Sequence, residues 1–135
     1  MKKLSIIALL AISASASAAT LQVKVDGVSN DKGTVNVYVC DQSNFPKNCK
    51  IAAVVPAHTG SVTADFADVA PGTWAVTVFH DENGNKKFDT NALGIPKEGY
   101  GFSNGAKARF SAPTFKEAAI TLTEGVNSAA VTLKY

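Results

Sequence analysis

The stretch GTWAVTVFHD, residues 72–81, decides the fold class of this chain. Apolar side chains recur in it at every second position, which is the periodicity of a β-strand. They occupy both faces of the strand: Trp74, Val76 and Val78 lie on one face, and Ala75 and Phe79 lie on the other. A strand that is apolar on both faces has to be covered on both faces. We therefore expect residues 74–79 to form a central strand of a sheet.

The same alternation recurs in short runs before and after this strand, whereas helical periodicity is scarce. The runs cover residues 21–25, 35–39, 51–55, 61–66, 118–122 and 129–133. Turn residues such as Asp26-Gly27 and Glu124-Gly125 divide them, and only residues 113–118 suggest one turn of helix. Each strand has an apolar face that a second sheet must cover. We predict an all-β domain, a single antiparallel β-sandwich of about seven strands with one long ordered loop.

Residues 1–18 have the composition of a secretory signal peptide. Lys2 and Lys3 precede the apolar run Leu4–Ile12, and small residues follow up to an Ala-x-Ala cleavage site that ends at Ala18. The apolar run is too short to span a bilayer, which takes about 20 residues. We expect cleavage after Ala18, which leaves residues 19–135 as one exported β-sandwich domain, most naturally periplasmic, with no membrane insertion.

Once this leader is set aside, the chain is electrically neutral. Of 13 basic residues, Lys2 and Lys3 lie in the leader, and the other 11 equal the 11 acidic residues. A neutral chain without a basic run argues against nucleic acid and anionic membranes as partners. We expect a monomer that recognises an unidentified ligand or protein partner.

The chain has two cysteines, Cys40 and Cys49. An oxidising compartment outside the cytoplasm favours a bridge between them. Residues 41–48, which lie between the two cysteines, have the composition of a turn throughout. A redox-active Cys-x-x-Cys site would need a shorter spacing. We therefore predict a structural disulfide that closes a hairpin-like loop.

Alternation stops between His80 and Lys107, and this segment contains the candidate metal site. Loops longer than about 12–15 residues are uncommon in compact domains and are usually functional or disordered. This one contains apolar residues that can pack on the domain, so we expect an ordered loop. Its first part has oxygen-bearing side chains at positions one, three, five and nine: Asp81, Asn83, Asn85 and Asp89. That is the spacing of a calcium-binding loop of EF-hand type.

The calcium hypothesis has two weak points and one competing interpretation. Lys86 stands at the sixth position, where Gly is usual, and Ala92 stands at the twelfth, where a bidentate Glu is usual. We expect Glu98 to supply the missing carboxylate, Lys87 to supply a backbone carbonyl, and the affinity to be weak. The competing interpretation is a run of turns in which Asp and Asn side chains bond to their own backbone without metal. The sequence leaves both open.

The residues around this loop carry a family resemblance. The segments HDENGN at residues 80–85 and GIPKEGYGFSN at residues 94–104 resemble the signature of domain-of-unknown-function family 2141, a family of exported bacterial domains. The resemblance spans nearly all of residues 19–135. It implies a transthyretin- or immunoglobulin-like β-sandwich and no established activity. Members usually have Gly where Lys86 stands.

A small periplasmic hydrolase is the alternative function. His80, Asp81, Glu98 and Ser103 have the residue types of acid–base or nucleophilic catalysis, but no nucleophile-elbow motif surrounds Ser103. We expect His80 to be a hydrogen-bonded structural residue rather than a base, and we assign no catalytic residue.

A binding or structural module is the favoured function. Aromatic residues near the loop could line a cleft for a ligand, although Trp74 and Phe102 fit a core position better. Tyr100 is the expected contact residue, because Gly99 and Gly101 on either side of it allow close approach of another backbone.

Overall fold

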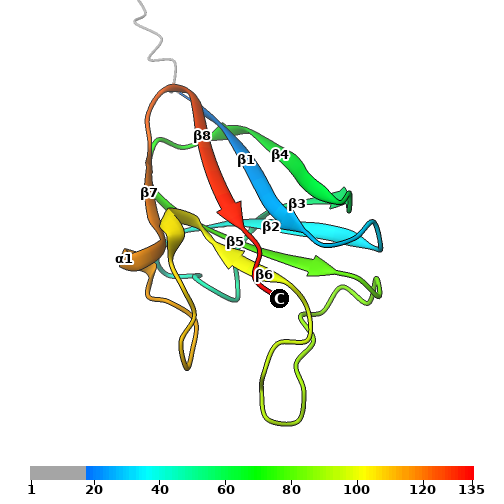
Figure 1. Ribbon diagram of the computed structural model, residues 1–135. Coiled ribbons are helices and arrows are strands. Elements are labelled where there is room, and N and C mark those ends of the chain that lie inside the picture. The colour runs from blue at the N-terminus through cyan, green and yellow to red at the C-terminus, as the bar shows by residue number, and fades with distance from the viewer. Residues whose placement is uncertain (1–17) are drawn as a thin grey trace, which may run out of the picture.

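The computed structural model describes residues 18–135, and they form two β-sheets that pack face to face (Figure 1). One sheet has three strands in the order β4 (Gly60–Val69), β1 (Ala19–Val28) and β8 (Gly125–Thr132). The other has five: β3 (Ile51–Pro56), β2 (Thr34–Cys40), β5 (Gly72–Asp81), β6 (Tyr100–Phe102) and β7 (Ala119–Leu122). The predicted all-β sandwich is therefore confirmed. The predicted signal peptide lies outside the described residues, except for Ala18.

Strand β5 is the central strand of the five-stranded sheet, as its two apolar faces predicted. It pairs with β2 along one edge, where Val78 lies opposite Val37. Two short strands share its other edge: β7 pairs with Gly72–Ala75 and β6 pairs with Thr77–Phe79. The core lies between the sheets and consists mainly of fully buried aliphatic side chains: Leu21, Val23, Val25, Val35, Val37, Val39, Val76, Val78 and Val131.

Two details differ from the sequence-based prediction. Strands β1 and β8 run parallel, with Ala19 opposite Gly125 and Val25 opposite Val131, whereas every other pair is antiparallel. Alternation shows that a segment is a strand, but it carries no information on the direction of a neighbour that is distant in sequence. The eighth strand, β6, lies inside the segment that we expected to be loop, because three residues are too few to show a period.

One helical turn was expected before residue 119, and the structure has it as α1 (Phe115–Ala118). The turn is stabilised by a capping box: Thr114 Oγ1 accepts a hydrogen bond from Glu117 N, and the Glu117 carboxylate accepts one from Thr114 N. Capping of this kind satisfies N–H groups that a short helix leaves without a partner. A short 3₁₀ turn, η1 (Ser103–Gly105), follows β6.

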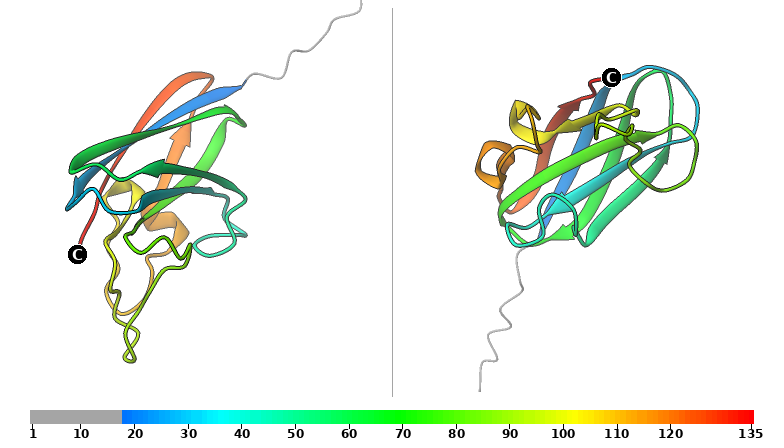
Figure 2. Two further views of the ribbon diagram at one scale, coloured as in Figure 1. Left: turned by 90° about the vertical axis from the view of Figure 1, so that its right-hand side faces the viewer. Right: turned by 90° about the horizontal axis from the view of Figure 1, so that it is seen from below.

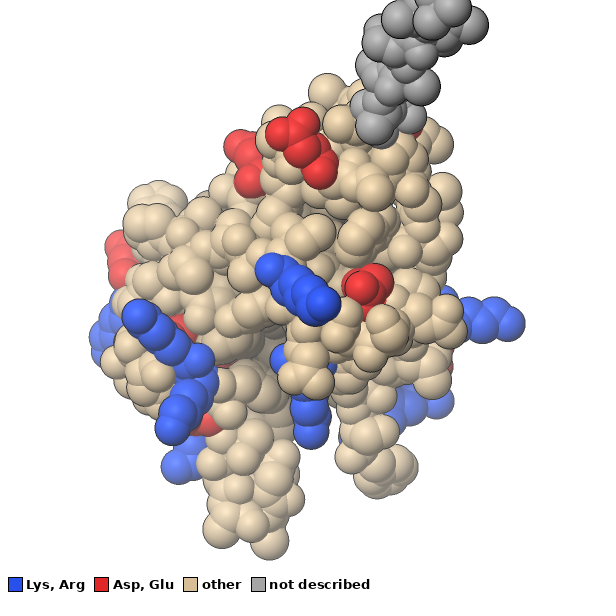
Figure 3. Space-filling model, turned by 180° about the vertical axis from the view of Figure 1, so that it is seen from behind, with Lys and Arg blue, Asp and Glu red and all other residues tan. Residues whose placement is uncertain are grey.

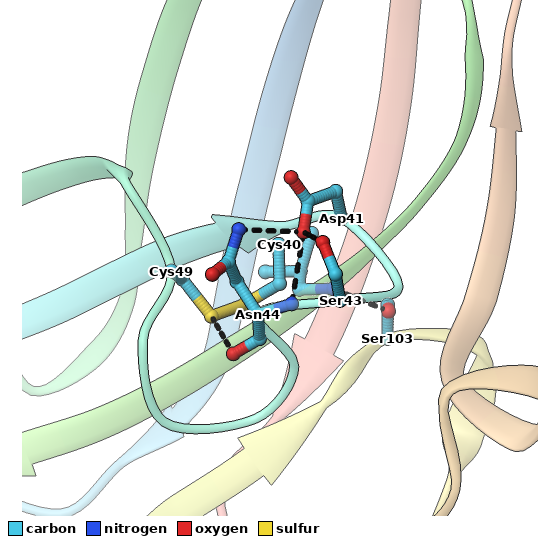
Figure 4. Close-up of a disulfide and its surroundings, with 7 residues drawn as sticks. Cys40, Asp41, Ser43, Asn44, Cys49 and Ser103 are labelled. Carbon is cyan, nitrogen blue, oxygen red and sulfur yellow. Dashed lines mark hydrogen bonds between the residues drawn. A yellow bond between two sulfur atoms is a disulfide. The ribbon is translucent and has the colours of Figure 1, made fainter.

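The predicted disulfide joins Cys40, the last residue of β2, to Cys49, which precedes β3 (Figure 4). Their Cα atoms lie 4.6 Å apart. Asp41 Oδ1 winds the loop between them, since it accepts hydrogen bonds from Ser43 Oγ and from the backbone and side-chain nitrogens of Asn44. The loop is thereby fixed at the end of β2, as the turn composition indicated.

Candidate functional site

The candidate site lies at the base of the loop that connects β5 to β6 and projects beyond the sheets (Figure 1). Asp81 is the last residue of β5, and Glu98 lies two residues before β6. The backbone N–H of His80 donates a hydrogen bond to the carbonyl of Gly99 across the base, at 2.8 Å. This bond brings the residues on either side of it, Asp81 and Glu98, to the same end of the sheet.

The first part of the loop is wound by its own polar side chains. Asp81 Oδ2 accepts a hydrogen bond from Lys86 N at 2.8 Å. Asn83 Oδ1 accepts one from Asn85 N at 3.1 Å, and Asn85 Oδ1 accepts one from Lys87 N at 3.0 Å. These are the turns that the metal-free interpretation predicted.

Lys86 is held in the left-handed backbone region, with φ of 63°. That conformation costs an L-residue roughly 1–2 kcal/mol relative to glycine. The position therefore favours Gly for a conformational reason, which is why the sixth place of such loops is usually glycine.

Asp89 contacts the side chains of this turn. Its carboxylate accepts hydrogen bonds from Asn83 Nδ2 at 2.7 Å and from Asn85 Nδ2 at 2.8 Å. A hydrogen bond with Glu98 and these two amide donations hold the pKa of Asp89 below its usual range. Three residues predicted as ligands, Asn83, Asn85 and Asp89, are thus joined by hydrogen bonds.

Glu98, the predicted fifth side chain, is 5% exposed and lies against Asp89, whose backbone N–H and carboxyl group both act on its pKa. Neither of its carboxylate oxygens has a hydrogen bond of good geometry within residues 18–135. Asp81 is 1% exposed, and its Oδ1 also lacks a donor. Burial, and after it the neighbouring carboxyl groups of Asp89 and Asp81, raise the pKa of Glu98 to about 8. Two carboxyl groups in contact must share a proton or a cation, because carboxylates alone can only accept.

The site is open to solvent on one side. Glu98 and Asp89 line a pocket of about 410 Å³, together with Glu82, Asn83, Thr90 and Lys97. An ion could therefore reach the carboxylates without unfolding of the loop.

Carboxylates alone do not complete a metal shell here. Within residues 18–135, no three His, Cys, Asp or Glu side chains are gathered in a way that could hold a metal ion. A cation would also need the amide oxygens of Asn83 and Asn85, or backbone carbonyls such as that of Lys87. Each amide oxygen accepts one backbone N–H and has a second lone pair free.

His80 and Ser103, the residues of the catalytic alternative, do not lie in a catalytic arrangement. His80 is fully buried, and both ring nitrogens are engaged: Nδ1 lies 2.7 Å from the Tyr135 hydroxyl and Nε2 lies 2.6 Å from the Lys32 carbonyl. Ser103 is also fully buried, and its hydroxyl bonds to Val76 N and to the Ala118 carbonyl. Val76 is four residues from His80 on β5, a span of about 13 Å along a strand. His80 has the structural role that we expected.

Tyr100 belongs to a row of aromatic rings on the outer face of the five-stranded sheet, which sequence reasoning missed. Its ring lies 5.9 Å from Phe88 and 6.0 Å from Phe102, measured between centroids. Contacts of similar length continue the row, through Phe79 to Tyr38 at one end and through Phe45 to Phe115 at the other. Phe102 is therefore half-buried in this row rather than in the core, and only the strand register could have shown it.

The glycines beside Tyr100, which we expected to allow close approach at a ligand contact, pack against the chain's own C-terminal segment. A Cβ on Gly99 would lie 2.5 Å from the ring of Tyr135, and one on Gly101 would lie 2.7 Å from the backbone of Thr132. Both glycines thus make room for the C-terminal segment of the chain itself.

These features define an all-β sandwich whose longest loop gathers buried carboxyl groups at its base. The chain belongs to the family described as uncharacterized proteins conserved in bacteria (DUF2141), whose model matches residues 23–130. This confirms the resemblance inferred from the residues around the loop. Comparison with curated proteins found no match, and comparison with solved structures found none. Among residues 18–135, no helix is long and apolar enough to cross a membrane.

Proposed function

We propose that this protein is an exported, calcium-binding β-sandwich module in which the ion fixes the loop between β5 and β6. The observation that carries the proposal is the set of buried carboxylate oxygens without a donor, Asp81 Oδ1 and both oxygens of Glu98. A buried carboxyl group must either hold a proton or be paired with a cation. A cation between these groups would supply the missing partner.

The donor set favours calcium over other metals. All the available ligands are oxygens: the side chains of Asp81, Asn83, Asn85, Asp89 and Glu98 and the carbonyl of Lys87. Calcium takes six to eight oxygens in irregular geometry and accepts a bidentate carboxylate, whereas magnesium demands a near-ideal octahedron. Zinc prefers Cys and His, and here both cysteines are bonded to each other and both nitrogens of His80 are engaged.

The affinity should be weak, because Lys86, Lys87 and Lys97 lower the negative potential around the site. We place the dissociation constant at about 10⁻⁴–10⁻³ M, the range of extracellular calcium modules. At 1 mM calcium and a constant of 10⁻⁴ M, binding would stabilise the fold by about 1.4 kcal/mol. For a domain of this size, that corresponds to a rise of about 3–7 °C in melting temperature.

The test is thermal melting in calcium and in chelator. The wild-type protein should melt higher in calcium by the amount above. Glu98→Gln should abolish this rise, because it removes the bidentate carboxylate and keeps the shape of the side chain. Asp65→Asn is the matched control, since Asp65 is exposed on β4, in the other sheet, and the rise should persist in this variant. If the wild-type protein has the same melting temperature in calcium as in chelator, the loop is a set of metal-free turns.

A further inference from the structure

Two loops project from the same end of the sandwich. One is the loop that contains the candidate calcium site, residues 82–99, and the other, residues 106–114, connects η1 to α1. Both extend past the sheets in the same direction in Figure 1 and in the left view of Figure 2, and both form separate lobes in Figure 3.

Large apolar side chains stand at the tips of these loops and are exposed. Leu93 is 84% exposed and Ile95 is 55% exposed, and Phe110, in the second loop, is fully exposed. The residues from Thr90 to Pro96 contain no charge, and the tips of both lobes are free of charged side chains in Figure 3. Exposed apolar side chains that gather at one place mark an interaction site more often than scattered ones do.

Hydrogen bonds stabilise the turns at the tips of both loops, and the exposed apolar side chains lie on these turns. Asn91 Oδ1 accepts hydrogen bonds from the backbone N–H groups of Leu93 and Ile95, and Asn91 N donates to the carbonyl of Ile95 at 2.8 Å. In the second loop, Arg109 N donates to the carbonyl of Ser111 at 3.3 Å, which places Phe110 at the apex.

Basic side chains surround the bases of the same loops. The loops carry five of them, Lys86, Lys87, Lys97, Lys107 and Arg109, against two exposed or half-buried carboxylates, Glu82 and Asp89. Figure 3 shows Lys and Arg side chains around the bases of both lobes, with some acidic atoms among them, and further acidic side chains toward the opposite end of the molecule. Residues 19–135 carry no net formal charge, but their charges are unevenly distributed.

We propose that these two loops dock on the surface of an anionic phospholipid membrane. The apolar tips would enter the interfacial region, and the basic side chains behind them would contact the phosphate groups. A bilayer presents this order of chemistry, with apolar chains beneath an anionic surface. The net charge of the sequence predicted no such partner, because it does not show where the charges gather in space. This proposal goes beyond calcium binding and does not require it.

Co-sedimentation with vesicles tests the proposal. The protein, purified from cells that express the full 135-residue sequence, is mixed with vesicles of phosphatidylglycerol and phosphatidylcholine in equal parts, or of phosphatidylcholine alone. We expect stronger binding to the anionic vesicles and a decrease as salt is added. The measurement is made in chelator and in calcium, so that binding in either condition counts.

Variants separate the loops from other binding surfaces. The triple variant Leu93→Ser, Ile95→Ser, Phe110→Ser and the double variant Lys107→Glu, Arg109→Glu should each bind anionic vesicles at least about tenfold more weakly. Val54→Ser with Val126→Ser is the matched control, because these exposed apolar residues lie on strands β3 and β8, and it should bind as the wild type does.

Two outcomes would overturn the proposal: no binding of the wild type to anionic vesicles in either condition, or equal binding by all variants. The calcium proposal is tested by melting without vesicles, so the failure of one proposal is distinguishable from the failure of the other.

Discussion

Glu98 has the most perturbed chemistry of the side chains around the loop. A carboxyl group that is buried beside Asp89 and Asp81 is stable only with a proton or a cation. Near neutral pH, and without a cation, the raised pKa of about 8 means that a proton occupies this position. A calcium ion and this proton would therefore compete, and binding of one would release the other.

This competition predicts how calcium affects stability at different pH. The pKa of Glu98 is about 8 in the folded protein, against an ordinary value of about 4.5. Folding therefore takes up a proton between pH 4.5 and pH 8. Stability from this group is present below pH 4.5 and is lost as pH rises through 8. Calcium should replace the lost proton, so its stabilising effect should be larger at pH 8.5 than at pH 6.

The measurement is the difference in melting temperature between calcium and chelator at the two pH values. Groups that do not contact the ion contribute equally with and without calcium, so their titration cancels in this difference. Glu98→Gln should remove the pH dependence of the difference. A difference of the same size at both pH values in the wild type would contradict the role assigned to Glu98.

At the scale of an element, the loop between β5 and β6 combines tight turns with one strained residue. Asp81, Asn83 and Asn85 fold it through bonds to its own backbone. Lys86 completes the turn at positive φ, where a side chain is unfavourable. The loop is therefore less stable than its hydrogen bonds alone would make it.

Lys86→Gly should relieve this strain. We expect the free energy of unfolding to rise by about 0.5–1 kcal/mol, seen as a melting temperature roughly 2–5 °C higher. Lys87→Gly is the control, because it removes the same charge at a residue whose φ is not positive, and it should lower stability. If both variants have the same effect, charge rather than backbone conformation limits the loop.

At the scale of the whole molecule, the last residue connects segments that are far apart in sequence. The Tyr135 hydroxyl accepts a hydrogen bond from Ser29 N at 3.0 Å and bonds to His80 Nδ1. Since the Lys32 carbonyl can only accept, His80 Nε2 donates to it. Nδ1 of the neutral ring then accepts the hydroxyl proton of Tyr135. The C-terminus thus closes the base of the loop beside Gly99.

Tyr135→Phe should be destabilising, because it leaves the buried Nδ1 of His80 without a partner. The expected loss is about 1–3 kcal/mol of unfolding free energy, measured by denaturant titration. Tyr38→Phe is the matched control, since Tyr38 contacts Phe79 through its ring, which the substitution keeps, and it should change stability little. Equal effects of the two substitutions would contradict the role of Tyr135.

The local sequence was sufficient for several features of this protein. Period-two alternation predicted the strands and the central place of residues 74–79, because side chains on a strand alternate between faces. Two cysteines around a turn predicted the disulfide, and the Asp and Asn side chains of residues 81–85 indicated turns bonded to their own backbone. All of these depend on residues that are close together along the chain.

Only the tertiary structure decided the features that depend on distant residues. The parallel pairing of β1 with β8, the aromatic row around Tyr100 and the His80–Tyr135 bond each join segments whose separation hides them from any local pattern. The same is true of the burial that raises the pKa of Glu98 and of the five basic residues that the two projecting loops bring to one end. A pKa and a surface potential depend on distances through space and on the exclusion of water, and folding alone determines both.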